Sequence, residues 1–184
     1  MQGAVEPAHT EAAPARTRPR AAAICRRLLA FAAVCASGLL ASAWISFRFT
    51  PRPAVWVIRN LFRAGARATS AALAKHVPAG VCEQPDLVYD PCDAHAELDL
   101  YRPAGAAGAL PTIVWVHGGA LLAGSRKDLG NYARIVAARG FVVASVGYSV
   151  APEARFPTPV RQVNRALRYL REHAAALGID AERF

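Results

Sequence analysis

The sequence predicts an α/β domain over residues 79–184, and two observations support this fold class. Residues 112–116 and 141–146 are short apolar runs, which is the pattern of strands buried on both faces of a sheet. Each run is followed by a segment whose apolar residues recur at helical spacing. Strands that alternate with helices in this way favour parallel strands joined by crossover helices.

Two further strands are expected before these runs. Residues 81–90 and 95–103 are rich in strand-forming residues and flank turn residues that begin at Pro91. We expect them to form an antiparallel hairpin at the edge of the sheet.

Helix boundaries can also be assigned. The first helix is expected to begin near Ser125, whose spacing from Asp128 is like that of a capping box, and to end at Gly140. The second is expected to begin at Pro157 and to end at Gly178.

An apolar segment lies upstream of the domain, because residues 28–47 contain no charge. A helix of this length, at about 1.5 Å per residue, spans a hydrocarbon core of roughly 30 Å. The segment predicts either a transmembrane anchor or a signal peptide cleaved after Ala43, where small residues cluster. The run is longer than the apolar region of an ordinary signal peptide, which favours the anchor.

Arginines on the two sides of this segment predict its orientation. Five lie within fifteen residues before it and three within fifteen residues after it. The positive-inside rule then favours a single-pass membrane protein with an extracytoplasmic domain, and the alternative is secretion after cleavage near Ala43.

The remaining N-terminal residues divide into a tail and a linker. Residues 1–27 are rich in Ala, Pro and Arg and predict a disordered basic tail. Residues 48–78 predict a linker with a basic amphipathic helix, in which Val55 and Leu61 share an apolar face. Such a helix lies on an anionic membrane or packs on the following domain, and the pattern does not decide between the two.

Positive charge is concentrated before the domain. Residues 1–70 contain ten arginines and two glutamates, whereas residues 71–184 contain twelve basic and eleven acidic side chains. An excess around an apolar segment indicates membrane topology and attraction to a membrane surface. No basic stripe interleaved with aromatic residues follows, so a nucleic-acid partner is not expected.

Two of the four cysteines flank the expected hairpin. Cys82 and Cys92 pair across it in an exported protein or remain two free thiols, and spacing alone does not decide.

The first apolar run ends in His117, Gly118 and Gly119, which a buried strand does not need. Glycines at a strand end let the backbone turn sharply or let a ligand approach closely. Residues 119–126 fit GxxxxG, but Ser125 stands where a phosphate-binding loop needs lysine. We therefore interpret the loop as an oxyanion hole, whose backbone N–H groups stabilise the negative charge that develops in acyl transfer.

Four blocks, in the same order, resemble α/β-hydrolase esterases and lipases of the HGGG type, particularly hormone-sensitive-lipase-like and related carboxylesterases. They are LDLYRP, IVWVHGGALLAGSR, GYSVAPEARFP and VNRALRYLREHAAALGIDAERF. The resemblance covers about residues 81–184 and implies the N-terminal part of such a domain, truncated before the nucleophile. It also implies hydrolysis of a small-molecule ester or lipid without a cofactor.

The resemblance assigns a role to each loop residue. The amides of Gly119 and Ala120 would donate to the oxyanion, and Gly118 would permit the turn. His117 would orient the loop rather than act as the base. Ala120 replaces the third glycine of the family pattern, which a backbone donor tolerates.

Leu121 and Leu122, which follow the donors, are expected to face apolar substrate. The family's serine nucleophile stands in G-x-S-x-G, which is absent from these residues, and Ser149 in GYSVA is followed at once by Pro152. No metal-ligand cluster is found in the sequence. We expect the nucleophile, base and acid to lie in sequence beyond Phe184; the alternative is an inactive hydrolase-like module that acts as a membrane-tethered scaffold.

Overall fold

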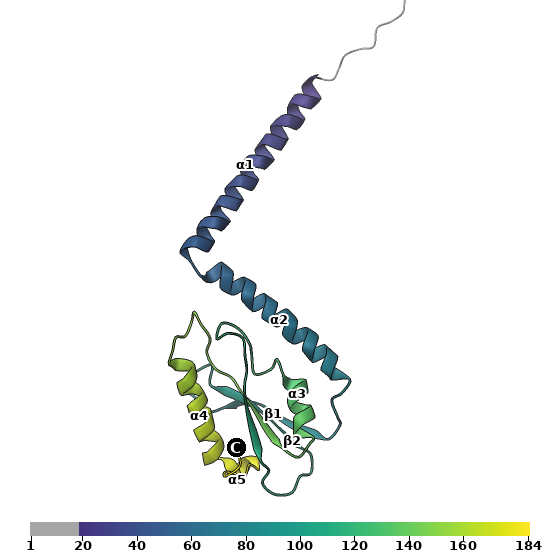
Figure 1. Ribbon diagram of the computed structural model, residues 1–184, viewed down its shortest axis with the longest axis vertical. Helices are drawn as coiled ribbons and strands as arrows, with labels where there is room; N and C mark the ends of the chain where they lie inside the picture. Colours follow the sequence, from purple (N-terminus) through teal and green to yellow (C-terminus); the bar gives the residue numbers. More distant parts are fainter. Residues whose placement is uncertain (1–18) are drawn as a thin grey trace, which may run out of the picture. The chain divides into compact units, whose positions relative to one another are not determined.

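The computed structural model describes residues 19–184, and its helices and strands are drawn in Figure 1. The chain divides into two compact units, Met1–Pro51 and Arg52–Phe184. Each unit is described by itself.

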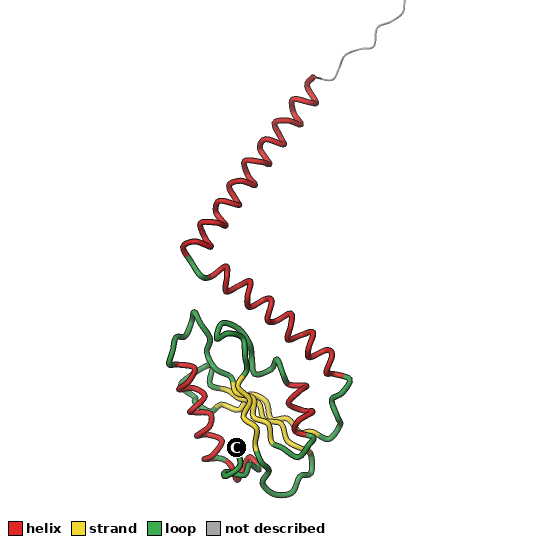
Figure 2. Tube along the Cα trace, viewed as in Figure 1, coloured by secondary structure: helices red, strands yellow, loops and turns green. Residues whose placement is uncertain are grey.

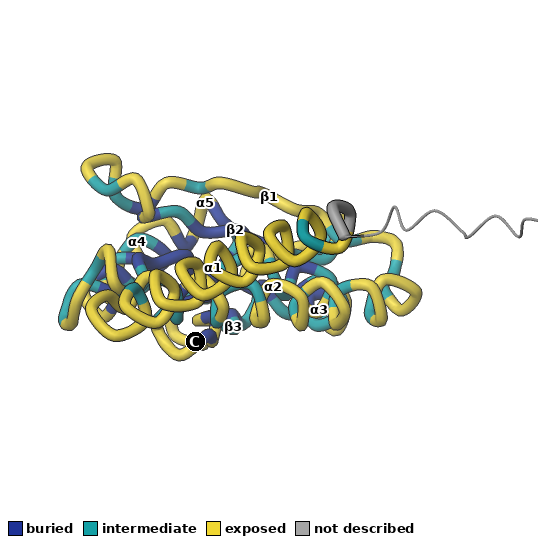
Figure 3. The backbone as a smooth tube through the Cα atoms, turned by 90° about the horizontal axis from the view of Figure 1, so that it is seen from above, coloured by how far each residue is buried: buried dark blue, intermediate teal, exposed yellow. Residues whose placement is uncertain are grey.

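The described part of the first unit forms the helix α1 (Pro19–Phe49). Its segment Ala22–Phe49 is long and apolar enough to cross a membrane, and a signal sequence would meet the same criterion. Figure 3 shows α1 exposed along nearly all of its described length. The tail predicted for residues 1–27 ends too late, because alanines and arginines with high helix propensity start the helix at Pro19. Residues 1–18 of that predicted tail lie outside the described residues.

The second unit is built on a four-stranded sheet, whose strands are yellow in Figure 2. The order of the strands in the sheet is β1-β2-β4-β3. Its strands are β1 (Val81–Val88), β2 (Glu97–Pro103), β3 (Thr112–Val116) and β4 (Val142–Val146). β1 and β2 form the predicted antiparallel edge hairpin, and β3 and β4 form the predicted parallel pair. β2 and β4 are antiparallel, so the sheet is mixed.

β4 lies inside the sheet, between β2 and β3. All of its residues are buried, as expected for a run such as VVASV that has neighbours on both sides. β1 is the opposite case, because it is an edge strand and most of its residues are exposed (Figure 3).

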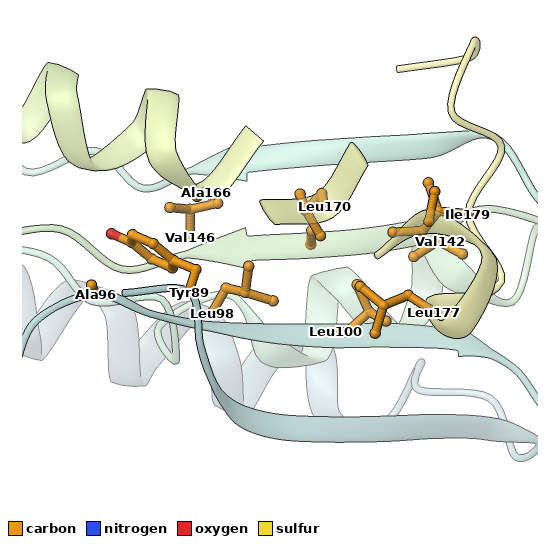
Figure 4. Close-up of a cluster of buried hydrophobic side chains, with 12 residues drawn as sticks. Tyr89, Ala96, Leu98, Leu100, Val142, Val146, Ala166, Leu170, Leu177 and Ile179 are labelled. Atoms are coloured by element: carbon orange, nitrogen blue, oxygen red, sulfur yellow. The ribbon is translucent and has the colours of Figure 1, made fainter. Parts of the chain in front are cut away.

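Helices cover both faces of this sheet (Figures 1 and 2). α4 (Thr158–Glu172) and the short α5 (Ala174–Leu177) cover one face. There Ala166 and Leu170 pack onto alternate residues of β2 and β4 (Figure 4). α3 (Gly130–Ala137) covers the other face, where Ala133 and Ala137 pack against Tyr101 and Val143.

The boundaries of both expected helices differ from those in the structure. The helix expected from Pro157 to Gly178 is interrupted at His173, so it forms α4 and α5. The helix expected from Ser125 to Gly140 begins later than expected. Asp128 does accept a hydrogen bond from the Ser125 amide at 2.8 Å, as in a capping box. The residues between them form turns, however, and α3 begins only at Gly130.

The predicted amphipathic helix is α2 (Arg52–Ala74), and it packs on the α/β domain. Val55 is buried, and Asn131 of α3 donates hydrogen bonds to the carbonyl and hydroxyl oxygens of Ser70. Val55 and Leu61 do not share one environment, because Leu61 is exposed. One side of α2 is thus bound to the domain, and the opposite side is open.

Cys82 and Cys92 are free thiols. Cys82 lies opposite Arg102 near the start of β1, whereas Cys92 follows the far end of that strand. A strand rises about 3.3 Å per residue, and a disulfide requires Cα atoms within about 7 Å. The alternative in which these cysteines pair across the hairpin is therefore wrong.

Candidate active site

The loop His117–Gly124 leaves the carboxyl end of β3 and turns back on itself. Ala123 and Leu122 donate their amide hydrogens to the carbonyl oxygen of Gly119, at 2.9 and 3.0 Å. Ala120 and Leu121 both have a φ of 56°, in the left-handed region that residues with a side chain rarely adopt. Tertiary contacts must hold such a backbone, and strain of this kind often accompanies function.

Two glycines make the loop possible. Gly119 has a φ of 125°, and a Cβ added there would lie 2.1 Å from the carbonyl oxygen of Ala123. Gly124 has a φ of 95°, and its Cβ would lie 2.1 Å from the carbonyl oxygen of Gly118. Both positions combine a backbone conformation suited to glycine with a close backbone approach. The spacing GxxxxG therefore serves the closure of this loop on itself.

Four consecutive amides of the loop are without an intramolecular partner. Within residues 19–184, the N–H groups of Gly118, Gly119, Ala120 and Leu121 donate to no protein acceptor. Backbone donors that lack a protein partner are available to water or to a ligand. A row of such donors at a strand end is suited to an anionic oxygen.

His117 fixes the start of the loop. Its ring is buried and lies parallel to the ring of Tyr148, with centroids 4.1 Å apart. Its Nδ1 lies 2.9 Å from the carbonyl oxygen of Gly118. A carbonyl oxygen only accepts hydrogen bonds, so Nδ1 is the donor and Nε2 is unprotonated in the neutral ring. Burial lowers the pKa of His117, which keeps the ring neutral near pH 7.

A second segment supports the loop from the end of β4. The Tyr148 hydroxyl donates to the His117 carbonyl oxygen at 2.6 Å, and the Ala151 amide donates to the Leu121 carbonyl oxygen at 2.7 Å. From α2, Arg59 donates to the carbonyl oxygens of Leu122 and Ala151. Sequence reasoning gave Tyr148 and Arg59 no role in this site, because both act through backbone atoms of distant residues.

An ion-pair cluster anchors the C-terminal end of the loop. Arg126 contacts three carboxylates, those of Asp86, Glu97 and Asp99. Asp99 is only 1% exposed, and it also accepts the Asp86 amide at 2.9 Å. A buried carboxylate needs such compensation, so the cluster ties the loop to β1 and β2.

A cavity of about 580 Å³ adjoins the loop on the side of His117 and Gly124. Arg59, Ser149 and Glu153 also line it. None of the residues from Gly118 to Leu122 lines this cavity. Leu121 is exposed and Leu122 is partly buried, so their substrate-facing role stays a prediction.

Ser149 is held in a structural network. Its amide donates to Gln162 Oε1 and its Oγ accepts from Gln162 Nε2, both at 2.8 Å. Gln162 also donates to Asp93. No histidine bonds to Ser149 in the part of the chain that the structure describes, so it lacks the base that activates a serine nucleophile. The same residues hold no group of three or more potential metal ligands.

A mixed sheet with helices on both faces, and a loop of free amides at the end of a parallel strand, define an α/β-hydrolase-like domain. Comparisons with known proteins agree. The BD-FAE family model matches residues 98–184. An ethyl acetate hydrolase of Pseudomonas putida is 36% identical over 113 residues, which are 57% of this chain and 36% of that protein. Human arylacetamide deacetylase-like 3 is 33% identical over 54% of this chain and 26% of its own length.

Solved structures give the same result. A bacterial heroin esterase matches 68% of this chain and 39% of its own, with 34% identity and a TM-score of 0.57. Esterase B of Lactobacillus rhamnosis matches 70% of this chain and 42% of its own, with 26% identity and a TM-score of 0.60. These matches show an α/β-hydrolase-like fold, and the relatives described here are esterases and other hydrolases. The chain spans between 26% and 42% of the length of these relatives.

Proposed function

We propose that this chain supplies the oxyanion-hole half of a carboxylic ester hydrolase that uses a serine nucleophile. The observation that carries the proposal is the row of free amides at Gly118, Gly119 and Ala120, beside the left-handed backbone of Ala120. In acyl transfer, such donors stabilise the negative charge on the former carbonyl oxygen. The esterases among its relatives support ester hydrolysis as the reaction.

Within this proposal, Gly119 and Ala120 donate to the oxyanion. The turn that was expected to need Gly118 depends instead on Gly119 and Gly124, because a Cβ at Gly118 would meet nothing within 4 Å. The neutral ring of His117 orients the loop and is not the base, because its Nδ1 is bonded to Gly118 and its ring is stacked on Tyr148. Leu121 and Leu122 face the apolar part of the substrate. The nucleophile, base and acid come from sequence outside these residues, and no cofactor takes part.

The test is hydrolysis of p-nitrophenyl butyrate by the complete gene product that contains this segment. Wild-type protein should turn the ester over. Gly119→Ala keeps the amide but forces the loop to move, because its Cβ would lie 2.1 Å from the carbonyl oxygen of Ala123. Displaced donors should lower kcat by about 10²–10³-fold, as the loss of one oxyanion donor does. Gly65→Ala is the matched control, because a Cβ there meets nothing within 4 Å and its φ is not positive.

A second arm uses only the 184 residues. They should show no turnover above a heat-killed control, because oxyanion donors without a nucleophile leave only residual catalysis. Turnover that Ser149→Ala abolishes would identify Ser149 as the nucleophile and overturn the proposed roles. An inactive complete protein that no serine-directed fluorophosphonate labels would instead favour a scaffold.

We also propose that Ala22–Phe49 anchors the protein in a membrane, with the hydrolase domain on the extracytoplasmic side. Its most apolar window of 18 residues has a mean hydropathy of 2.1, and none of that window is buried. Anchored protein should resist carbonate extraction, and added protease should digest the domain in intact spheroplasts. A soluble product that begins at Trp44 would show cleavage after Ala43 instead.

The open side of α2 supports contact with lipid. Trp56 and Leu61 are 68% and 71% exposed, and α2 contains four arginines and no acid. Only Thr50 and Pro51 lie between Ala22–Phe49 and α2 in the sequence, so in this proposal α2 starts close to the membrane interface. An amphipathic helix of this composition suits an anionic surface.

Tryptophan fluorescence tests this contact in the full chain. With Trp44 and Trp115 changed to phenylalanine, brominated lipids in anionic vesicles should quench Trp56. The control moves the tryptophan to Val160, an exposed residue of α4, by adding Trp56→Phe and Val160→Trp. Equal quenching at both positions, or none at Trp56, would contradict lipid contact by α2.

A further inference from the structure

We propose that Arg59 is a positioning residue for the oxyanion loop. It lies in the second turn of α2, outside the α/β sheet and more than sixty positions before the residues that it binds. The inference rests on the proposed function, because it concerns how the loop amides are held.

The planar guanidinium of Arg59 donates four hydrogen bonds. Nε donates to the carbonyl oxygen of Leu122 at 2.8 Å, and Nη2 donates to the carbonyl oxygen of Ala151 at 2.9 Å. Nη1 and Nη2 also donate to the two oxygens of Glu153, at 3.0 and 2.6 Å. Arginine suits this arrangement because its planar donors are pre-organised for two-point contacts.

The two carbonyl groups belong to the two segments that shape the site. Leu122 follows directly on the left-handed residues Ala120 and Leu121, and Ala151 donates its own amide to Leu121. Arg59 therefore closes a ring of contacts around the strained part of the loop. A residue with a side chain keeps a left-handed conformation only where surrounding contacts stabilise it. Arg59 contributes some of these contacts.

Glu153 keeps the guanidinium in place. The hydrogen bonds and charge of Arg59 lower the pKa of Glu153 to about 2, so the carboxylate is ionised at any ordinary pH. Glu153 is exposed, and an exposed ion pair alone contributes little. The two backbone carbonyl groups, rather than the ion pair, are thus the contacts that matter for the loop.

Substitutions in the complete protein distinguish the contacts of Arg59 with the two carbonyl groups from its ion pair with Glu153. Arg59→Met keeps the apolar stem and removes all donors, so kcat for p-nitrophenyl butyrate should fall at least tenfold with KM within twofold. Donors that act on the developing oxyanion affect the transition state rather than substrate binding. Arg59→Lys should recover part of kcat, and Glu153→Gln should lower it less than Arg59→Met. Arg168→Met, which removes an exposed arginine of α4, is the matched control.

Hydrogen exchange gives a readout that does not need catalysis. In Arg59→Met, the amides of Leu122 and Ala123 should exchange at least threefold faster than in wild type, and in Arg168→Met they should not. Unchanged exchange and unchanged kcat in Arg59→Met would overturn the inference. An equal loss of kcat in Arg59→Met and Arg168→Met would do the same. A wild-type protein without esterase activity would count against the proposed function, while the exchange arm would still test Arg59.

Discussion

Tyr148 holds His117 in two ways at once. Its hydroxyl donates to the His117 carbonyl oxygen at 2.6 Å, and its ring lies within 9° of parallel to the imidazole. The end of β3 and the segment after β4 are thereby fixed to each other at the start of the loop His117–Gly124. The loop therefore starts from a rigid point, although its amides from Gly118 to Leu121 have no acceptor within the described part of the protein.

Removing only the hydroxyl tests this relationship. Tyr148→Phe keeps the ring stack and leaves the carbonyl oxygen of His117 without its donor. We expect the free energy of unfolding to fall by about 1–2 kcal/mol, the usual cost of losing a buried hydrogen-bond partner. Urea unfolding measures the change, and Tyr132→Phe is the control because no hydrogen bond of that hydroxyl is recorded in the described part of the chain.

The buried ring of His117 predicts a pH dependence of stability. Its pKa is lowered by burial, so below about pH 6.5 the unfolded chain binds a proton that the folded chain does not. Stability should therefore decrease as the pH falls from 7 through this range. Carboxylates with lowered pKa values, such as Glu153, affect stability only at lower pH. Urea unfolding of wild type and His117→Gln at pH 7.5 and 5.5 tests this, and an equal slope in both proteins would contradict it.

Gly124 is expected to tolerate no side chain. In Gly124→Ala the new Cβ meets the Gly118 carbonyl oxygen and the His117 ring, and the backbone keeps a positive φ. We expect destabilisation of at least about 2 kcal/mol, because strain in the backbone adds to the clash. Thermal unfolding beside the control Gly65→Ala measures it, and a matching Tm in the two variants would refute the close approach.

Arg126 should stabilise the fold mainly by neutralising the buried carboxylate of Asp99. Arg126→Met leaves the buried Asp99 carboxylate without a cation, which costs about 3–5 kcal/mol when a buried pair is broken. Asp99→Asn in the same chain should restore part of this loss, because the remaining amide is neutral. A double-mutant cycle by urea unfolding measures the coupling, and additive losses would contradict a direct pair.

The free thiols give a simple chemical test. Cys82 and Cys92 are exposed, so both should react with a maleimide without prior reduction. Mass spectrometry of the labelled domain counts the adducts, with Cys82→Ser and Cys92→Ser each removing one. A mass two hydrogens below that of the reduced chain, together with no labelling at either residue, would indicate the disulfide that the strand geometry excludes.

Much of the fold could be predicted from local patterns. The apolar runs correctly gave the strands β3 and β4, and β4, which has neighbours on both sides, is buried throughout as expected. β3 is an edge strand and most of its residues are only half-buried, so its expected burial on both faces was wrong. The order β1-β2-β4-β3 was not predictable from these patterns, since nothing in the sequence of β3 says that β4 will separate it from β2. The α/β-hydrolase resemblance, in contrast, came from several blocks in order and was confirmed.

The glycines of the site could be predicted from the sequence, whereas the residues that hold the loop in place could not. A glycine signals an unusual backbone, but Ala120 and Leu121 adopt left-handed conformations that their side chains disfavour. Arg59 looked like one of several arginines on a basic helix face, because its acceptors are carbonyl groups that every residue has. Gln162 was likewise not expected in the core, where the remote Ser149 and Asp93 satisfy its amide.

The place of β4 has a consequence for the order of folding. β2 and β3 each bond to β4, which follows them in the chain, and neither has the other as a neighbour. During synthesis the β1–β2 hairpin can form early from local contacts, whereas β3 must wait for its partner. Closing the intervening loop costs entropy before any strand pairing compensates it. The sheet therefore assembles late, when residues 142–146 leave the ribosome, and the amide-bearing loop gains its shape only in that same step.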